Sequence, residues 1–336
     1  MIDLRSDTVT QPTKAMKEAM FMAHVGDDVF EEDPSINQLE AKTAKLFGHQ
    51  AALFCPSGTM TNQIAIRVHT QPGGEVICSN LAHIYHYEGG GIALNSGCSV
   101  RLIEGNRGRF TAQQVEENIN NPNDVHAART QLVALENTMN KGGGSVWDTA
   151  EIKEIKKVCV RNQLPLHLDG ARLFNALIKT GESSSAIGPL FNSISICLSK
   201  GLGCPVGSLL VGNHDFIRKA RRTRKAMGGG MRQAGMLAAA GIYALDHHVE
   251  RLREDHIHAE ILADALKING NVREVLPVET NIVLFKMDRD PTKVLEILKA
   301  NGILAVQMGK DGIRLVTHLN INRKQVDQTA ELLRSI

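Results

Sequence analysis

Aromatic residues and long apolar runs are both scarce in this sequence. Phe, Trp and Tyr make up 4% of the 336 residues, which leaves little for the stacking platforms that bind single-stranded nucleic acid. The longest apolar stretch, from Gly235 to Leu245, spans 11 residues, against the roughly 20 needed to cross a bilayer. The start, MIDLRSDTVT, is polar and acidic, unlike a secretory signal. We therefore expect a cytoplasmic protein with no membrane span.

The chain also lacks an excess of either charge, since 38 Lys and Arg face 36 Asp and Glu, a formal net charge of +2. Binding a polyanion over a broad surface needs a larger positive field. One segment departs from this balance, because residues 218–225, RKARRTRK, include six basic residues. We expect a solvated helix face or a subunit contact there, with nucleic-acid binding as the alternative.

The sequence has no recognisable metal-binding motif. The six cysteines form no C-x-x-C pair and mostly lie in apolar runs, so we expect buried free thiols rather than zinc ligands or disulfides. Four histidines cluster within residues 247–258, but His256 and His258 are about 200° apart on a helix, and we expect the cluster to be exposed. The residues concerned are Cys55, Cys78, Cys98, Cys159, Cys197 and Cys204, and His247, His248, His256 and His258.

The first two-thirds of the chain alternates short apolar runs with helical patterns. Strand, helix and strand in turn imply right-handed crossovers and a mostly parallel sheet covered on both faces. We therefore predict an α/β core. The predicted strands are AALFC, EVICS, CSVRLI, TQLVALE, LPLHLD, SISICLS and GSLLVG, and helices are predicted from about Met60 and over residues 150–162.

The pattern changes after a long helical stretch expected from about Gln233 to Lys267. The segments VREVLPVETNIVLFKM, PTKVLEILKANG, ILAVQ and GIRLVTH, with a closing helix, predict a small α+β domain. We predict an N-terminal arm over residues 1–30, a large domain over 31–248 and a small domain over 249–336. The boundary is expected near residues 246–255.

Asp169 ends a run, LPLHLD, that is otherwise apolar enough for a buried strand. A buried carboxylate is unfavourable without a partner, and in a parallel sheet the ligand crevice lies at the carboxyl ends of the strands. Asp169 and the nearby Arg172 are therefore candidates for a site. The alternative is that Asp169 caps a helix or forms a structural ion pair.

Lys200 follows another apolar run, SISICLS, and leads into Gly201, Gly203 and Gly207. Desolvation among apolar and glycine residues favours the neutral amine, which can attack a carbonyl and form a Schiff base. The alternative is a surface lysine in a turn.

The segment ALFCPSGTMTNQIAI places Ser57, Gly58 and Thr59 between an apolar run and a helix. Backbone N–H groups and hydroxyls at a helix N-terminus can bind a phosphate, although a simple Ser or Thr cap has the same pattern. Neither G-x-x-x-x-G-K-S/T nor G-x-G-x-x-G occurs, so no nucleotide fingerprint competes. A phosphate cup, a carboxylate and a strand-end lysine are together the parts that pyridoxal 5′-phosphate needs.

Longer motifs are MIDLRSDTVTQP, VGDDVF, PSGTMTN, HLDGARLFNA, SICLSKGLG, PVGSLLVG, GGGMRQ, LAAAGIYAL and RLVTHL. From Met1 to about Leu319 they make the sequence resemble the low-specificity L-threonine aldolases, pyridoxal-phosphate enzymes with the aspartate aminotransferase fold. The resemblance implies the seven-stranded, mostly parallel sheet of fold-type-I enzymes. It also implies retro-aldol cleavage of L-threonine, L-allo-threonine and related amino acids to glycine and an aldehyde. The expected assembly is a homo-oligomer, a tetramer built from dimers that share active sites.

For the cofactor ring, the resemblance implies that Lys200 forms the Schiff base, that Asp169 pairs with the pyridine nitrogen and that Arg172 lies near the ring hydroxyl. His83, in NLAHIYHYEGGG, is similar to the histidine that stacks on the ring and lies near the substrate hydroxyl. A metal site made by His83 and His86 is the alternative, and it lacks a convincing third ligand.

For the cofactor phosphate, the resemblance implies that Ser57, Gly58 and Thr59 bind it. Arg232, which follows the three glycines at 228–230, resembles the residue that a neighbouring subunit donates to the same phosphate. Lys225 is a further candidate for this part of the site.

For the substrate, the resemblance implies that Ser6 and Arg314 take the carboxylate and that Arg172 assists, since a fork-shaped guanidinium suits that group. His83 or His126 is then the base that removes the β-hydroxyl proton, directly or through water. His126 lies just before ARTQLVALE and is the second histidine beside the site.

Two positions depart from the family pattern. The usual Glu-Asn-Thr-His reads ENTM over residues 136–139, and Met139 cannot accept a proton, which strengthens the case for His83 or His126. Tyr87 stands where some relatives have Phe and is expected beside the substrate side chain.

Three other functions stay open at this stage. Another fold-type-I enzyme, such as a hydroxymethyltransferase, an aminotransferase or a β-eliminating lyase, would share Lys200 and Asp169 but differ in its substrate contacts. A non-enzymatic binding protein or a nucleic-acid-binding protein would stay colourless with pyridoxal phosphate.

Overall fold

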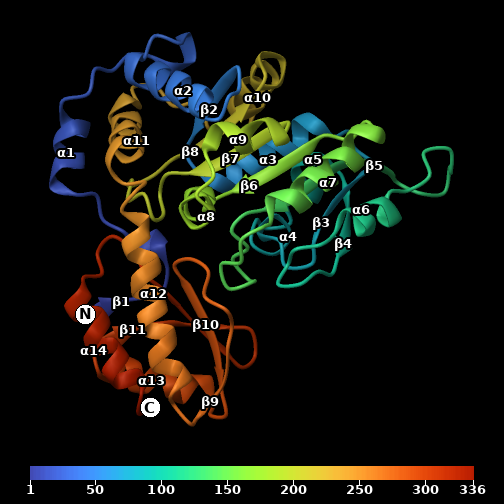
Figure 1. Ribbon diagram of the computed structural model, residues 1–336. Coiled ribbons are helices and arrows are strands. Elements are labelled where there is room, and N and C mark those ends of the chain that lie inside the picture. The colour runs from blue at the N-terminus through green and yellow to red at the C-terminus, as the bar shows by residue number, and fades with distance from the viewer.

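The structure is a computed structural model that describes all 336 residues, with two main sheets that each have a hydrophobic core (Figure 1). The larger sheet has seven strands, and β8 is the one strand that runs antiparallel to its neighbours. This confirms the predicted mostly parallel sheet. The strands, in order across the sheet, are β2 (Ala51–Cys55), β8 (Ser208–Gly212), β7 (Ser193–Cys197), β6 (Leu166–Gly170), β5 (Arg129–Glu136), β3 (Gly74–Ser79) and β4 (Ser99–Ile103).

Successive side chains of a strand point to opposite faces of the sheet. The strands carry apolar side chains on both faces, and helices pack against each face. In β2, Ala52 and Phe54 belong to one apolar cluster, whereas Leu53 and Cys55 belong to another. All six cysteines are buried free thiols, as predicted. The first cluster includes residues of α2 (Pro34–Leu46), α7 (Thr149–Arg161), α8 (Leu173–Thr180) and α11 (Gly235–His247), and the second includes residues of α3 (Gly58–His69) and α10 (His214–Ala226).

The C-terminal part forms a four-stranded antiparallel sheet with its own core of 20 buried residues. It is the predicted α+β unit, and it lies below the large sheet in Figure 1. Its strands, in sheet order, are β12 (Val306–Met308), β13 (Gly312–Val316), β10 (Ile282–Met287) and β9 (Val272–Val275), and its helices are α12 (Leu252–Lys267), α13 (Pro291–Ala300) and α14 (Arg323–Leu333).

The N-terminal arm connects the two parts. Its first strand, β1 (Ile2–Asp3), pairs in parallel with β11 (Ile303–Leu304), and Ile2 and Leu4 are buried in the small core. The arm then reaches the large sheet, where α1 (Lys14–Phe21) packs against α11. The remaining short elements are α4 (His83–His86), α5 (Gly91–Ser96), α6 (Ala112–Asn118), α9 (Ser184–Ile187) and the 3-10 helices Asp7–Val9, Asp28–Phe30 and Gly188–Leu190. No helix has both the length and the apolar character that crossing a membrane requires.

The histidine cluster differs from its prediction. His247 is exposed, but His248, His256 and His258 are buried. The predicted single helical stretch is two helices, and α12 packs against α8, α14 and β10, which leaves little of it exposed to solvent at these histidines. His256 Nε2 meets Asn175 Oδ1 at 3.0 Å, and burial lowers the pKa of His256 to about 4.

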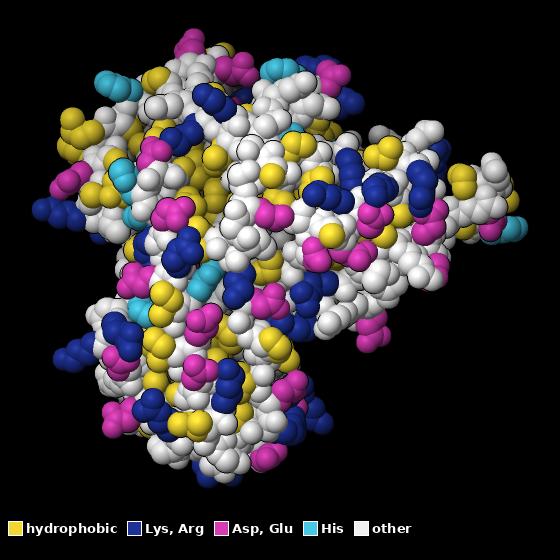
Figure 2. Space-filling view, in the orientation of Figure 1, with side chains coloured by type: hydrophobic (Ala, Val, Ile, Leu, Met, Phe, Trp, Pro, Cys, Tyr) yellow, Lys and Arg dark blue, Asp and Glu magenta, His cyan; other side chains and the backbone are white.

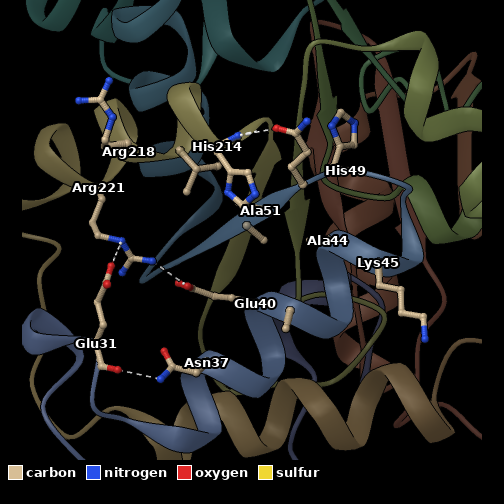
Figure 3. A pocket seen from close by; sticks show the side chains of 14 residues that line it. Glu31, Asn37, Glu40, Ala44, Lys45, His49, Ala51, His214, Arg218 and Arg221 are labelled. Carbon is tan, nitrogen blue, oxygen red and sulfur yellow. Dashed lines mark hydrogen bonds and ion pairs between the residues drawn. The ribbon is translucent and has the colours of Figure 1, made fainter.

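The basic segment, residues 218–225 of α10, is only partly a solvated face. Arg224 is buried and pairs with Asp28 at 2.6 Å, and Arg221 pairs with Glu31 at 3.0 Å and Glu40 at 2.8 Å (Figure 3). These ion pairs attach α10 to α2 and to the segment just before it. The exposed basic residues are Arg218, Lys219, Arg222 and Lys225, and charges of both signs are mixed over the face in Figure 2.

Candidate active site

A cavity of about 140 Å³ opens where β6 and β7 end, the edge at which parallel sheets bind ligands. Five predicted site residues, Gly58, Thr59, His83, Asp169 and Lys200, line it together although they come from four separate segments. The full lining consists of Gly58, Thr59, Asn62, His83, Glu88, Asp169, Ala171, Cys197, Ser199 and Lys200.

Residues 57–59 form the start of α3. Ser57 is the N-cap, and its Oγ accepts from Met60 N–H at 3.2 Å. The N–H groups of Gly58 and Thr59 have no partner within the helix because they belong to its first turn. A Cβ added to Gly58 would overlap Cys197 Sγ. Glycine is therefore required here by the close approach of β7, and the helix N-terminus faces the cavity that Thr59 lines.

Asp169 lies near the end of β6 and is buried. One carboxylate oxygen accepts from Asn62 Nδ2 at 3.0 Å and the other from Ala171 N–H at 3.1 Å. The N-cap of α8 is Arg172, and Asp169 forms no ion pair with a lysine or arginine. The alternatives of a helix cap or a structural ion pair are therefore wrong for Asp169.

Lys200 lies three residues beyond β7 and is half-buried. Its carbonyl oxygen accepts from Thr10 Oγ1 at 3.0 Å and from Gly203 N–H at 2.8 Å. The first bond brings the N-terminal arm to the lysine loop. Because the lysine lines the cavity, the alternative of a surface lysine in a turn does not apply.

His83 begins α4 and is held by two buried carboxylates. Its backbone N–H donates to Glu136 Oε2 at 2.7 Å, and its Nδ1 lies 3.1 Å from Glu88 Oε1. Burial alone would lower the pKa of His83, but the hydrogen bond to Glu88 and the charge of Asp169 raise it above its usual value. His86 instead meets the carbonyl of Asn80 at 2.7 Å, so the two histidines do not form a pair.

Glu88 and Glu136 are site residues that the sequence analysis missed. Glu88 also accepts from Asn62 Nδ2 at 2.9 Å and Gln63 Nε2 at 2.6 Å. Glu136 ends β5 beside Asp169, and burial together with that neighbouring charge raises the pKa of Glu136 to about 7. The motif YHYEGGG contains the first glutamate, but nothing in it indicates which residues surround a buried carboxylate.

Arg172 forms a buried ion pair with Asp7, a residue of the N-terminal arm that the sequence analysis also missed. Its Nε and Nη2 each donate to Asp7 at 2.7 Å, and both side chains are buried. Burial raises the pKa of Asp7, but the charge and hydrogen bonds of Arg172 outweigh it and lower that pKa to about 2. Asn281 Nδ2 reaches the same carboxylate at 3.2 Å. Asp7 therefore joins the arm to both sheets.

Arg314 lies beside Arg172, and both reach the amide oxygen of Asn140. The distances from their Nη1 atoms are 2.8 Å for Arg314 and 3.4 Å for Arg172. Arg314 Nη2 donates to the carbonyl of Arg5 at 3.0 Å, and its buried Nε has no partner. Burial and the charge of Arg172 lower the pKa of Arg314 to about 10. Two guanidinium groups that share one neutral acceptor are suited to an anion.

The remaining predicted substrate residues, Ser6 and Tyr87, do not line the cavity. Ser6 is the N-cap of the 3-10 helix that contains Asp7, and its Oγ accepts from Thr8 N–H at 3.2 Å. Tyr87 is half exposed, and its hydroxyl lies 3.9 Å from Met308 Sδ of the small domain. Met139 is fully buried and packs so closely on Gly108 that a Cβ there would overlap it. This position therefore contributes no side chain to the cavity.

Three further predicted residues, Arg232, His126 and Lys225, do not line the cavity of a single chain either. Arg232 is 54% exposed and pairs with Asp27 at 2.8 Å. His126 lies on an exposed segment between α6 and β5, where its N–H donates to Asp124 at 2.9 Å. Lys225 is exposed and lies beside Gly230. Their roles at the site stay predictions.

A larger hollow of about 920 Å³ lies elsewhere, between α2, β2 and α10 (Figure 3). Arg221 and Glu40 point toward one another across it, and none of the predicted site residues lines it. Glu31 and Glu40 of this hollow are already paired with Arg221.

The fold, together with the comparisons that follow, places the chain among the fold-type-I lyases, a class of pyridoxal-phosphate enzymes. A family model described as beta-eliminating lyase matches residues 3–290. The chain is 44% identical over 332 residues to the low specificity L-threonine aldolase of Escherichia coli K12, covering 98% of this chain and 97% of that one. It is 40% identical over 336 residues to low-specificity L-threonine aldolase 1 of Arabidopsis thaliana, covering 98% and 94%. The chain belongs to the low-specificity L-threonine aldolase family.

Solved structures agree with this fold. The threonine aldolase of Leishmania major matches with a TM-score of 0.86 at 23% identity over 99% of both chains. A putative L-allo-threonine aldolase of Listeria monocytogenes matches with a TM-score of 0.83 at 21% identity, covering 99% of this chain and 95% of that one. These likenesses confirm the predicted fold class.

Proposed function

We propose that this protein cleaves the Cα–Cβ bond of L-threonine, L-allo-threonine and related β-hydroxy-α-amino acids, giving glycine and an aldehyde. The observation that carries the proposal is one cavity that joins a helix N-terminus, Asp169, His83 and Lys200. The names of the relatives, L-threonine aldolase and L-allo-threonine aldolase, support the substrate class. The cytoplasm stays the predicted location.

The cavity residues fit pyridoxal 5′-phosphate. The first turn of α3 offers free N–H groups to a phosphate, and Gly58 lets this turn lie close to β7. The carboxylate of Asp169, which no lysine or arginine pairs, suits a protonated pyridine nitrogen. Lys200 supplies the amine for the aldehyde. When bound, the cofactor takes up the electrons left on Cα after cleavage.

Arg314 and Arg172 would bind the substrate carboxylate. Arg314 Nε has no partner, and the Nη1 atoms of Arg314 and Arg172 contact only the neutral amide oxygen of Asn140, so the substrate carboxylate could take its place. Fixing the carboxylate orients Cα–Cβ relative to the cofactor ring and so selects the bond that breaks. Ser6, next to Asp7, would assist.

His83 is our choice for the base that takes the β-hydroxyl proton. A carboxylate can only accept, so Glu88 requires the proton of a neutral His83 on Nδ1. Nε2 is then left with its lone pair. The raised pKa of His83 helps the ring to hold the proton that it takes. His126 stays the alternative base.

A second copy of the chain would complete the phosphate site. Apolar side chains gather over α1 in Figure 2, and the exposed fractions of Phe21, Met22 and Phe30 are 82%, 73% and 69%. Arg232 lies beside the segment that contains Phe30, because the N–H of Asp28 donates to the Arg232 carbonyl and Asp27 pairs with the Arg232 side chain. We propose that this surface forms a dimer in which Arg232 reaches the neighbour's phosphate, and that two dimers form the tetramer.

Mixing two inactive variants tests the shared site. Lys200→Ala and Arg232→Ala chains would be unfolded together and refolded with cofactor. If each site takes Lys200 and Arg232 from different chains, random pairing restores about a quarter of the intact sites. Activity of the mixture no higher than that of the separate variants would contradict the shared site.

The substrate class is tested by incubating the protein with the L and D forms of threonine and allo-threonine. We expect glycine and acetaldehyde from the L forms only. Glycine formation from serine that depends on folate, turnover that requires a keto acid, or release of pyruvate would each contradict the proposal. A protein that stays colourless with added cofactor would point to a non-enzymatic role.

A further inference from the structure

From the cavity, which Asn62 and Asp169 line, a line of polar side chains runs through the core of the large sheet. Asn62 Nδ2 lies 3.0 Å from Asp169, and Asn62 Oδ1 lies 3.1 Å from His167 Nε2. His167 Nδ1 lies 2.8 Å from Ser193 Oγ, which lies 2.8 Å from His69 Nε2. Asn62 and His69 lie on α3, and His167 and Ser193 occupy paired positions of β6 and β7.

Chemistry determines the direction of every bond in this line. Asn62 Nδ2 contacts two carboxylates, those of Asp169 and Glu88, so it must be the amide nitrogen, and Oδ1 must accept from His167. His167 therefore carries its proton on Nε2, and its Nδ1 accepts from the Ser193 hydroxyl. Ser193 Oγ in turn accepts from His69 Nε2–H. Every donor points toward Asp169.

The line is closed to water around His167. Asn62, His167 and Ser193 are buried, with His167 and Ser193 at 0% exposure. Burial lowers the pKa of His167 to about 3, so the ring is neutral, as the bond pattern requires. Polar groups in a sheet core are unfavourable unless all are hydrogen-bonded. Apolar residues at these positions would be enough to build the core. A function at Asp169 explains why polar residues are present instead.

We propose that His167, held by Ser193, is a positioning residue that keeps the Asn62 amide turned toward Asp169. Without the Nε2–H donor, only the two carboxylates hold the amide of Asn62, and its buried oxygen is left without a partner. The donor that fixes the Asp169 carboxylate beside the cavity would then be less firmly placed. The role assigned to Asp169 rests on the proposed function, whereas the protonation pattern does not.

Two variants of His167 separate positioning from packing. In His167→Gln the terminal amide can still donate to Asn62 Oδ1, whereas in His167→Asn the shorter side chain cannot reach it. His256→Asn is a matched control, because His256 is also buried and also meets an asparagine Oδ1, that of Asn175, at 3.0 Å.

Steady-state kinetics and cofactor affinity give the first readout. We expect His167→Asn to lower kcat and cofactor affinity about 3- to 10-fold, the range for a lost hydrogen bond between neutral groups, with KM for threonine changed less than about 2-fold. We expect His167→Gln to recover most of the loss and His256→Asn to keep the wild-type kcat. Equal losses in both His167 variants would overturn the proposal.

The ring nitrogens of His167 give a readout that needs no activity. In long-range ¹H–¹⁵N spectra of the wild-type protein, His167 is expected as the neutral Nε2–H form. In Ser193→Ala, which removes the donor to Nδ1 with little change of volume, we expect the ring to keep its proton on Nε2, because Asn62 Oδ1 still accepts from it, and only the Nδ1 resonance to shift. A wild-type His167 ring that carries its proton on Nδ1, or that is charged, would overturn the proposal even in an active aldolase. The expected spectra in a protein that does not cleave threonine would instead contradict only the proposed function.

Discussion

Replacing Asp7 with Asn tests how the N-terminal arm holds the two parts of the molecule together. The carboxylate of Asp7 accepts from Arg172 at two atoms and from Asn281. All three side chains are buried. The amide of Asn keeps the shape but removes the charge, so the guanidinium of Arg172 is left buried without its counter-ion.

The structure gives the size of the effect in two ways. Removing one partner of a buried ion pair costs about 3–5 kcal/mol. Lowering the pKa of Asp7 from its ordinary 3.8 to about 2 corresponds to about 2.5 kcal/mol in favour of the ionised form. We therefore expect Asp7→Asn to lower the free energy of unfolding by about 2.5–5 kcal/mol.

The assay is urea unfolding followed by circular dichroism, at pH 7 and at lower pH. Because the pKa of Asp7 is lowered in the native state, its contribution is present above pH 3.8 and is lost as the pH falls toward about 2. The matched control is Asp215→Asn, whose ion pair with Arg218 is exposed at 82% and 75% and is expected to contribute less than about 1 kcal/mol.

Two results would refute this reasoning. One is an Asp7→Asn protein whose free energy of unfolding lies within about 1 kcal/mol of the wild type. The other is an equal loss in Asp215→Asn. Replacing both Asp7 and Arg172 with apolar residues, Leu and Met, should recover part of the stability.

Three further predictions concern the cavity. Gly58→Ala should weaken cofactor binding measured by equilibrium dialysis, because the new Cβ overlaps Cys197 Sγ, and unchanged affinity would contradict this close approach. Glu88→Gln should lower the pKa of His83 in an NMR titration, since the ring loses its carboxylate partner; a rise would contradict it. Glu136→Gln should make the free energy of unfolding depend less on pH. The pKa of Glu136, raised to about 7, makes the wild type lose stability relative to this variant from about pH 4.5 to 7, and urea unfolding at pH 5 and 8 checks the sign.

The strand-end residues of the site could be predicted from the sequence. Asp169 and Lys200 each follow an apolar run, and a parallel sheet brings the ends of such runs to one edge. The N-terminus of α3 follows β2 in the same way. For these residues the neighbouring sequence determines the place in the fold.

The residues that hold the site in place could not be predicted in this way. Asp7, Glu88 and Glu136 depend on which distant segments fold against them, such as Arg172 for Asp7. The helical period places His256 and His258 on different sides of α12, but it does not indicate that neighbouring helices cover both. Charge alone likewise does not separate the buried Arg224 from its exposed neighbours.

The central claim is that Lys200 of this protein carries the cofactor for threonine cleavage. The most direct measurement compares acetaldehyde release from L-threonine by the wild type, by Lys200→Ala and by Lys179→Ala, an exposed lysine of α8, after adding pyridoxal phosphate. The account predicts release by the wild type and Lys179→Ala and none above background by Lys200→Ala. Full activity in Lys200→Ala would contradict it.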